Sequence, residues 1–418
     1  MGHENHDWGV GKNPPVIRSH SLAKHRVLRG YLERYVSVLT ANPRLDQFRL
    51  TLVDGFAGGG IYLDARTKEE RAGSPLIMLD AMDQAAEVAQ ASRVKPFHLD
   101  VHYIFVEKDA ETIDHLRGVI SKSKHAPLLA DRIQLLQGEF TAKVPEITAF
   151  VKQRGRAERA IFVLDQFGYI DVPLPTIRNI LATVDKAEVF MTFAVDFLID
   201  YLSVNEATQQ ILAKIGISLP SKTIGTAKES RDWRRSIQLA LHEQIRSQTA
   251  AKFYTPFFIR SEDSHRDFWL VHLSGHFRAR DVMVGLHWKE NRSFAHYGGS
   301  GLQMLGYDPK YDSDLTRQRM LPEFHFDQTA RASSHEELLR QLPERIFPSK
   351  DGISFESLFS NLTNECPVTA EIMKDVLNDL AKEGTIRVQD KQKLIIRRAG
   401  IQHDSDIILP NPQRRLFT

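Results

Sequence analysis

Hydrophobic positions in the first half of the chain follow two alternating spacings. Short runs of consecutive apolar residues alternate with longer segments in which apolar residues recur every three or four positions. The runs are typical of buried strands in a parallel sheet, and the longer segments are typical of amphipathic helices. The pattern therefore predicts a parallel sheet covered by helices on both faces. The predicted strands are 49–53, 101–106, 133–136, 160–164 and 188–193, and the predicted helices are 21–39, 75–91, 110–121, 144–154 and 175–184.

The middle of the chain ends this alternation. Residues 197–250 predict a helical insertion, which is followed by two further apolar strands at 253–259 and 268–274. The polar link between these two strands is short, and a short link joins antiparallel rather than parallel neighbours. The predicted fold class is therefore α/β, with a Rossmann-like, mostly parallel sheet whose last strand is antiparallel.

Beyond about residue 322 the pattern predicts a second domain. Two helices, 355–362 and 369–382, are separated by an Asn-Glu-Cys-Pro turn, and a hairpin is predicted at 384–388 and 394–397. Helix–turn–helix plus hairpin is the outline of a winged helix. The predicted domains are a flexible tail (1–18), an α/β domain (19–322) and a winged-helix-like domain (323–418).

Composition narrows the class of protein. The 55 Lys and Arg residues nearly balance the 53 Asp and Glu residues, so the net charge of +2 does not indicate a nucleic-acid binder. The single cysteine, Cys366, excludes an intramolecular disulfide and a cysteine-based zinc cluster. The 17 histidines show no metal-ligand spacing, so no metal site is predicted. Because the N-terminus lacks an apolar signal region and no apolar run could cross a bilayer, we expect a cytoplasmic protein with no membrane partner.

A glycine-rich turn, Asp54-Gly-Phe-Ala-Gly-Gly-Gly60, directly follows the first strand. Such a turn at the carboxyl edge of a parallel sheet is where α/β folds bind nucleotides, and only glycine lets a cofactor approach the backbone closely. The alternative is a plain turn whose glycines serve packing. The candidate cofactor-binding residues of the turn are Asp54, Gly55, Phe56, Ala57, Gly58 and Gly60.

Acidic residues follow three other strands. Glu107 ends the second strand, where an acid can accept hydrogen bonds from both ribose hydroxyls, although a surface carboxylate is the alternative. Glu139 follows the third strand and is a second candidate cofactor contact, because an acid at this place in methyltransferase folds commonly meets the adenine amino group; an acid without that role is the alternative. Asp165 and Phe167 follow the fourth strand in Asp-Gln-Phe-Gly and are the candidate catalytic residues. The carboxylate can accept hydrogen bonds from a substrate amine while the ring stacks on a base; the alternative is an acid that closes the strand without chemistry.

Five segments together resemble the three-Cys-motif partner protein family, over about 20–290. The resemblance implies an S-adenosylmethionine-dependent methyltransferase-like fold, S-adenosylmethionine as cofactor, a bacterial or phage-linked setting, and a separate partner protein that carries a three-cysteine motif. Family members more often have Asp-Pro-Phe-Gly, so Gln166 is a departure in the candidate catalytic segment. The segments are His20-Ser-Leu-Ala-Lys24-His, Val53-Asp-Gly-Phe-Ala-Gly58, Gly73-Ser-Pro75, Phe105-Val-Glu107 and Leu164-Asp-Gln-Phe-Gly168.

Lys24 and His25, with His20, lie on the first turns of the N-terminal helix. We predict a solvated helix start there; the alternative is a helix that folds over the cofactor carboxylate.

Two main functional hypotheses follow. The first is a methyltransferase that acts on an amino group, for example of a nucleobase, together with the three-cysteine partner. The second is a non-catalytic scaffold of the same fold that binds a partner protein or nucleic acid; the near-neutral charge, the acidic helix 369–382 and Gln166 favour it. A nuclease is a weaker third hypothesis, because no cluster of metal-ligating acids with a supporting lysine is evident.

Overall fold

The computed structural model has two compact units, 1–279 and 280–418, which are described separately below. All structural statements concern the residues whose placement is described. These are 8–9, 13–155, 159–166, 170–193, 205–219, 233–260, 267–289, 295–296, 300–302, 324–392 and 400–411.

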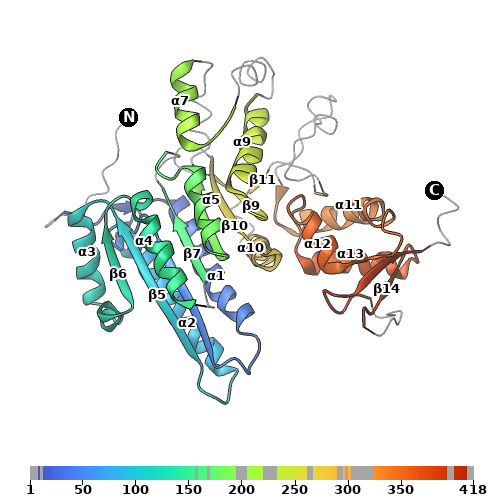
Figure 1. Ribbon diagram of the computed structural model, residues 1–418, viewed down its shortest axis with the longest axis horizontal. Coiled ribbons are helices and arrows are strands. Elements are labelled where there is room, and N and C mark those ends of the chain that lie inside the picture. The colour runs from blue at the N-terminus through green and yellow to red at the C-terminus, as the bar shows by residue number, and fades with distance from the viewer. Residues whose placement is uncertain are drawn as a thin grey trace. The chain divides into compact units, whose positions relative to one another are not determined.

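The first unit is built on a mostly parallel sheet (Figure 1). Its strands lie in the order β9-β10-β8-β7-β2-β5-β6. The five strands from β8 to β6 pair in parallel, and β10 is antiparallel to both β8 and β9. The predicted Rossmann-like, methyltransferase-type sheet with a reversed last strand is therefore confirmed. The strands are β2 (Gln47–Asp54), β5 (His98–Glu107), β6 (Ile133–Gln137), β7 (Arg159–Leu164), β8 (Lys186–Phe193), β9 (Phe253–Arg260) and β10 (Asp267–Ser274).

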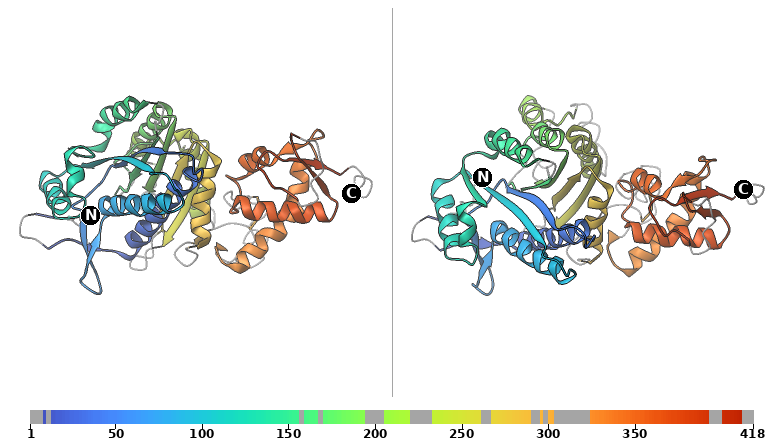
Figure 2. Two further views of the ribbon diagram at one scale, coloured as in Figure 1. Left: turned by 90° about the horizontal axis from the view of Figure 1, so that it is seen from below. Right: turned by 60° about the horizontal axis from the view of Figure 1, so that its bottom comes forward.

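Helices cover both faces of this sheet (Figure 2). From β2 the chain runs outward to β5 and β6, then returns to β7 and continues to β8. Crossovers between parallel strands are right-handed. The helices that connect β2, β5 and β6 therefore lie on one face of the sheet, and the helices that lead back to β7 and on to β8 lie on the other. Thus α1 and α2 pack together on one face, and α4 and α5 lie on the other. The helices are α1 (Ser19–Leu39), α2 (Ser74–Ala91), α3 (Ala110–Ser121), α4 (Phe140–Gln153) and α5 (Leu174–Thr183).

Part of the predicted flexible tail, 1–18, packs against this unit. Trp8 is buried, and β1 (Val16–Ile17) pairs in parallel with β3 (Ile61–Asp64). Strand β3 also forms an antiparallel hairpin with β4 (Glu70–Ala72). The glycine turn therefore continues into a hairpin before α2 begins. Within the predicted insertion, 197–250, the structure describes α7 (Glu206–Ile215) and α9 (Trp233–Thr249).

The second unit contains a winged helix, as predicted. Helices α12 and α13 form the helix–turn–helix, and β14 and β15 form the wing, in a sheet of order β13-β15-β14 whose pairs are all antiparallel. The predicted second wing strand, 394–397, lies outside the described residues. The elements are α10 (Phe277–Lys289, which contains the boundary between the units), β11 (Ala295–His296), β12 (Phe324–His325), α11 (Gln328–Ile346), β13 (Ile353–Ser354), α12 (Phe355–Leu362), α13 (Ala370–Lys382), β14 (Ile386–Gln389) and β15 (Ile407–Pro410).

A buried arginine holds the turn between α12 and α13. The Arg280 guanidinium is 1% exposed and donates to the carbonyls of Val368, at 2.9 Å, and Cys366. Asp281 beside it accepts from the N–H of Ala370 at 2.7 Å, at the start of α13. Replacing a buried hydrogen-bonded charge leaves its acceptors without partners, and such a loss is costly.

We therefore expect Arg280→Met to lower the free energy of unfolding by about 3 kcal/mol. Chemical denaturation of the full chain measures this. The matched control is Arg278→Met, two residues away on the exposed side of α10, for which a change within about 0.5 kcal/mol is expected. Equal effects of the two substitutions would contradict the assigned role of Arg280.

Candidate functional site

Three carboxylates meet at the carboxyl edge of the parallel strands. Asp54 ends β2, Glu107 ends β5 and Asp165 directly follows β7. In the strand register Asp54 lies opposite Phe105 of β5 and Val163 of β7. The chain reverses its direction across the sheet between β2 and β7, and open α/β sheets bind ligands in the crevice at such a switch point. The topology therefore singles out this edge as the candidate site.

The glycine turn is tied to both neighbouring strands. The N–H of Gly55 donates to the Val163 carbonyl at 2.9 Å, and the N–H of Ala57 donates to the Val106 carbonyl at 3.0 Å. Gly58 has a φ of +60°, a left-handed conformation that glycine adopts without strain, and its N–H donates to Oε2 of Glu107 at 3.0 Å. The structure thus brings Glu107 and the turn together.

Glu107 is held in a fixed orientation. Its Oε1 accepts from the backbone N–H groups of Lys108, at 2.7 Å, and Asp109, at 3.1 Å. Because a carboxylate has about four acceptor positions, three backbone donors leave capacity for a ligand hydroxyl.

Most glycines of the turn are also required by the protein's own packing. A Cβ on Gly55 would lie 2.8 Å from the Leu164 side chain, and a Cβ on Gly60 would lie 2.7 Å from that of Leu116. A Cβ on Gly59 would lie 2.4 Å from Trp8. Gly58 differs, because its nearest neighbours are Trp8 at 3.0 Å and the Tyr62 hydroxyl at 3.2 Å.

Trp8 is a site residue that sequence reasoning missed. Its Nε1 donates to the Ile61 carbonyl at 2.9 Å, and its ring meets Tyr62 edge-on at 5.4 Å. The only available signal was one tryptophan in a polar, glycine-containing tail, and that signal does not predict a contact with Gly59.

Asp54 is the most strongly perturbed acid of the site. Its side chain is fully buried; Oδ1 accepts from the Phe56 N–H at 3.1 Å, whereas Oδ2 has no hydrogen-bond partner among the described residues. Burial raises the pKa of Asp54 to about 7, and the side chain of Ser74 and the N–H of Phe56 oppose this rise. The charges of Asp165 and Glu107 add to the rise, so all three acids lie within electrostatic reach of one another.

The raised pKa of Asp54 predicts a pH-dependent stability. An acid whose pKa is higher in the folded than in the unfolded state stabilises the fold fully below the unfolded pKa, near 3.9. This contribution is lost as pH rises through the folded pKa of about 7. We expect Asp54→Asn to gain stability relative to the native chain between pH 4 and pH 7, measured as unfolding free energy by denaturant titration. A constant difference across that range would contradict the assignment; Asp114→Asn on the exposed part of α3 is the control.

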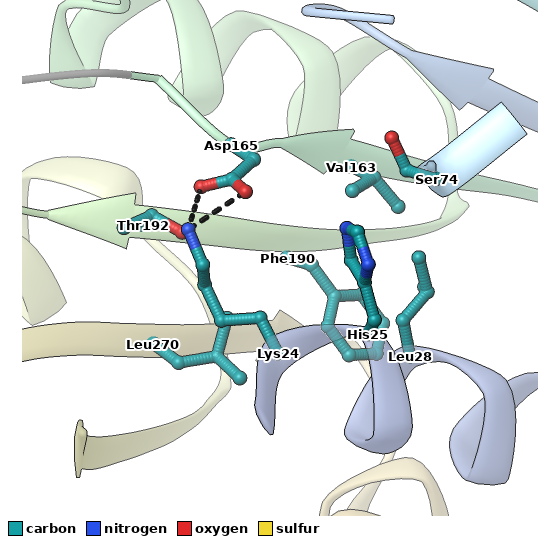
Figure 3. Close-up of a pocket in the computed structure, with 9 residues that line it drawn as sticks. All are labelled: Lys24, His25, Leu28, Ser74, Val163, Asp165, Phe190, Thr192 and Leu270. Carbon is teal, nitrogen blue, oxygen red and sulfur yellow. Dashed lines mark hydrogen bonds and ion pairs between the residues drawn. The ribbon is translucent and has the colours of Figure 1, made fainter. Parts of the chain in front are cut away.

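Asp165 is paired with a lysine from the N-terminal helix (Figure 3). Nζ of Lys24 lies 2.6 Å and 2.7 Å from the two carboxylate oxygens. Burial tends to raise the pKa of Asp165, but the Lys24 charge and hydrogen bond outweigh it, with help from Thr192 and His25. The pKa of Asp165 is therefore lowered and its carboxylate stays ionised.

The predicted solvated helix start is wrong. The Lys24 side chain is only 11% exposed, and burial lowers the pKa of His25 to about 4, so its imidazole is neutral near pH 7. Lys24 and His25 line a small cavity of about 20 Å³ between α1 and the sheet. Leu28, Ser74, Val163, Asp165, Phe190, Thr192 and Leu270 complete the lining.

The remaining predicted site residues lie as follows. Glu139 is exposed just before α4 and forms an ion pair at 3.0 Å with Lys108, beside Glu107. Phe167 lies outside the described residues. Gln166 is buried, and its Oε1 accepts from the Val172 N–H at 3.1 Å, a bond that proline could not make. Gln166 thus ties the segment after β7 to the start of α5.

A group of potential metal ligands lies elsewhere in the first unit. Oxygen and nitrogen atoms of Asp80, Asp83 and His125 lie within 4.8 Å of one another. Nζ of Lys124 lies 3.1 Å from Asp80 and 2.9 Å from Asp83, so an ammonium already neutralises these carboxylates. No metal is assigned to this group.

Comparison with known proteins identifies the second unit. Residues 306–393 match the family of GMT-like wHTH domains. This match covers less than half of the chain, and no functionally curated protein matches the chain.

Several solved structures share a weak overall likeness with this chain. Protein LPL1258 from Legionella pneumophila str. Philadelphia 1 is 12% identical, with 64% of this chain and 91% of that chain covered and a TM-score of 0.35. Fibrillarin from Aeropyrum pernix, solved with bound S-adenosyl-L-methionine, is 9% identical, with 59% and 76% covered and a TM-score of 0.25. The plantazolicin methyltransferase BamL, solved with SAH, is 8% identical, with 61% and 85% covered and a TM-score of 0.23. These values are too low for the likeness to carry an argument about function.

Among the described residues, no helix is long and apolar enough to cross a bilayer.

Proposed function

We propose that this protein is an S-adenosylmethionine-dependent methyltransferase whose cofactor lies at the switch point between β2 and β7. The observation that carries the proposal is the convergence of Asp54, Glu107 and Asp165 at that point, around a glycine in left-handed conformation. The topology of the sheet predicts a ligand there, and the chemistry of the residues selects which ligand.

The charges favour a cationic cofactor over a dinucleotide. In dinucleotide-binding folds the glycine turn opens directly into a helix whose N-terminus binds the pyrophosphate. Here the turn continues into the β3–β4 hairpin, and α2 begins only at Ser74. Three acidic side chains gather here, although Lys24 offsets the charge of Asp165. Their oxygens suit the sulfonium and amino groups of S-adenosylmethionine better than a pyrophosphate.

The residues at the turn fit that cofactor. Oδ2 of Asp54 is a buried acceptor without a partner among the described residues, and an amino group would satisfy it. Glu107 would accept from a ribose hydroxyl at its remaining acceptor position, and the turn at Gly58 would present its backbone to the methionyl part. Glu139 would lie near the adenine. S-adenosylmethionine supplies a methyl group on sulfur that is already activated, so the protein's main task is positioning.

Asp165 would orient the accepting amine. Its lowered pKa keeps it ionised, and an ionised carboxylate can only accept hydrogen bonds. It would therefore hold an N–H donor and turn the nitrogen lone pair towards the methyl group. Phe167 would stack on a nucleobase acceptor, as the sequence predicts.

We propose that the winged helix binds the three-cysteine partner protein. Glu371, Asp375 and Asp379 on α13 form ion pairs with Arg331 and His335 of α11. An acidic helix whose cationic neighbours are already paired is a poor match for phosphates. We therefore favour docking of the three-cysteine partner protein over nucleic acid at this surface.

Two observations favour a second candidate, a non-catalytic scaffold. Trp8 lies over Gly58 and Gly59, and Lys24 occupies both oxygens of Asp165. On the scaffold hypothesis these contacts would be permanent and would close the site to ligands.

Transfer of a radiolabelled methyl group from S-adenosylmethionine distinguishes the two candidates. The full chain is incubated with DNA, RNA and total protein from the organism that produces it. Each incubation is done with and without the three-cysteine partner. The methyltransferase proposal predicts label in one of these fractions. Absence of label from all fractions in the presence of the partner supports the scaffold.

A further inference from the structure

The amine nearest to the candidate catalytic carboxylate belongs to the protein itself. Nζ of Lys24 lies 2.6 Å and 2.7 Å from the two oxygens of Asp165. Its side chain is 11% exposed, and 141 residues separate the two partners in the sequence. A lysine amine thus occupies the position in which Asp165 would hold the amine of a substrate (Figure 3).

The hydrogen bonds orient this nitrogen. A lysine ammonium has three N–H donors, and two are directed at the oxygens of Asp165. The third N–H is not needed for this ion pair. When that proton leaves, the nitrogen lone pair points away from Asp165 while the other two N–H groups keep the amine in place. This is the geometry that a methyl acceptor needs.

The cavity beside Lys24 reaches towards the proposed cofactor position. Ser74 lines the cavity and also lies next to the carboxylate of Asp54, at the end of β2. The cavity of about 20 Å³ holds about one water-sized group. A single methyl group is of similar size, so the cavity has room for one methyl on Nζ.

We propose that Lys24 is a methyl acceptor of this protein, modified at Nζ in its own site; this inference rests on the proposed function. The Lys24 ammonium loses its third proton to water, and the lone pair forms a bond to the methyl carbon of S-adenosylmethionine. The carbon–sulfur bond breaks, sulfur keeps the electron pair as the thioether S-adenosylhomocysteine, and the nitrogen takes the positive charge. The methylated ammonium keeps two N–H donors for Asp165, so the ion pair survives.

A second lysine at the same sheet edge provides the matched control. Lys108 also pairs with a carboxylate, Glu139, at 3.0 Å. Its side chain is 76% exposed, and it lies beyond Glu107 rather than beside Asp165. If methylation followed lysine accessibility alone, Lys108 would be modified before Lys24.

Intact mass and tandem mass spectra of the full chain, before and after incubation with S-adenosylmethionine, test the proposal. We expect a gain of one CH₂ unit located on Lys24. The gain should persist in Lys108→Arg and disappear in Lys24→Arg, which keeps the charge and the ion pair. Calorimetry gives a readout independent of turnover. Because the Lys24 ammonium repels the sulfonium, Lys24→Met should shift the ratio of affinities towards S-adenosylmethionine over S-adenosylhomocysteine by about tenfold, and Lys108→Met should not.

The outcomes distinguish failure of the proposed function from failure of the inference about Lys24. If neither S-adenosylmethionine nor S-adenosylhomocysteine binds, the proposed function fails and the inference fails with it. If both bind and Lys24 stays unmodified, or another lysine is modified instead, only the inference is overturned. Binding, one methyl on Lys24 and the shifted affinity ratio together support it.

Discussion

Replacing Gly58 with valine is expected to reduce the affinity for S-adenosylmethionine at least a hundredfold. Gly58 has a φ of +60°, and its N–H contacts Glu107 at 3.0 Å, so the turn and the ribose-binding acid are positioned together. A valine there would place its Cβ 3.0 Å from Trp8 and 3.2 Å from the Tyr62 hydroxyl, with branched methyl groups beyond. The added side chain would push against Trp8 and Tyr62 and so distort the turn against which the cofactor is proposed to lie. Calorimetric titration of the purified variant measures the loss.

Gly155→Val is the control for backbone strain. Gly155 has a similar left-handed φ of +76°, but a Cβ there has no heavy atom within 4 Å. Both substitutions force a β-branched residue into a disfavoured conformation, at a cost of about 1–2 kcal/mol of stability each. Only Gly58→Val should lose the cofactor. Equal cofactor binding by the two variants would show that the site is misplaced.

Replacing Asp165 with alanine is expected to abolish methyl transfer while cofactor affinity changes only a few-fold. The carboxylate stays ionised because Lys24, Thr192 and His25 lower its pKa, and its task is to orient the acceptor. Loss of an orienting group reduces turnover by about 10²–10⁴-fold. The label-transfer assay measures turnover, and calorimetry with S-adenosylhomocysteine measures affinity.

The variant Asp165→Asn distinguishes the effect of the charge of Asp165 from the effect of its side-chain shape. Asp165→Asn keeps the size of the side chain but introduces donors where only acceptors are useful, so it should be nearly as inactive as Asp165→Ala. Asp171→Asn, at an exposed position shortly after β7, should leave activity unchanged. An active Asp165→Asn variant would contradict the orienting role.

The architecture was largely predictable because it depends on local periodicity. Helix α3 and helix α12 have the predicted bounds, since long periodic segments carry a strong signal. The antiparallel pairing of β10 followed from the short link before it. By contrast, β1 and β3 have two and four residues, too few for any periodicity, and their pairing was not predicted.

The site was only partly predictable because its contacts join distant parts of the chain. Asp54, Glu107 and Asp165 could be placed at one edge, since the carboxyl ends of parallel strands share an edge. Nothing in the pattern of α1 distinguishes a lysine that faces solvent from one that pairs with Asp165, so Lys24 was assigned to a solvated face. Trp8 was missed for the same reason, because its partner Gly59 lies 51 residues away in a turn.

The structure explains why glutamine can stand at position 166, where the resembling family more often has proline. The Gln166 side-chain carbonyl accepts from the Val172 N–H, which lies just before α5. This bond fixes the residue next to Asp165, and the presence of Gln166 is compatible with a working carboxylate. Gln166 does not by itself favour the scaffold hypothesis.

Calorimetric titration of the full chain with S-adenosylmethionine and S-adenosylhomocysteine, with NAD as the control, tests the central claim most directly. The acidic switch point and the absence of a helix N-terminus at the glycine turn predict micromolar binding of the first two and no binding of NAD. Binding of NAD, or failure of both S-adenosyl compounds to bind even with the three-cysteine partner present, would contradict the account.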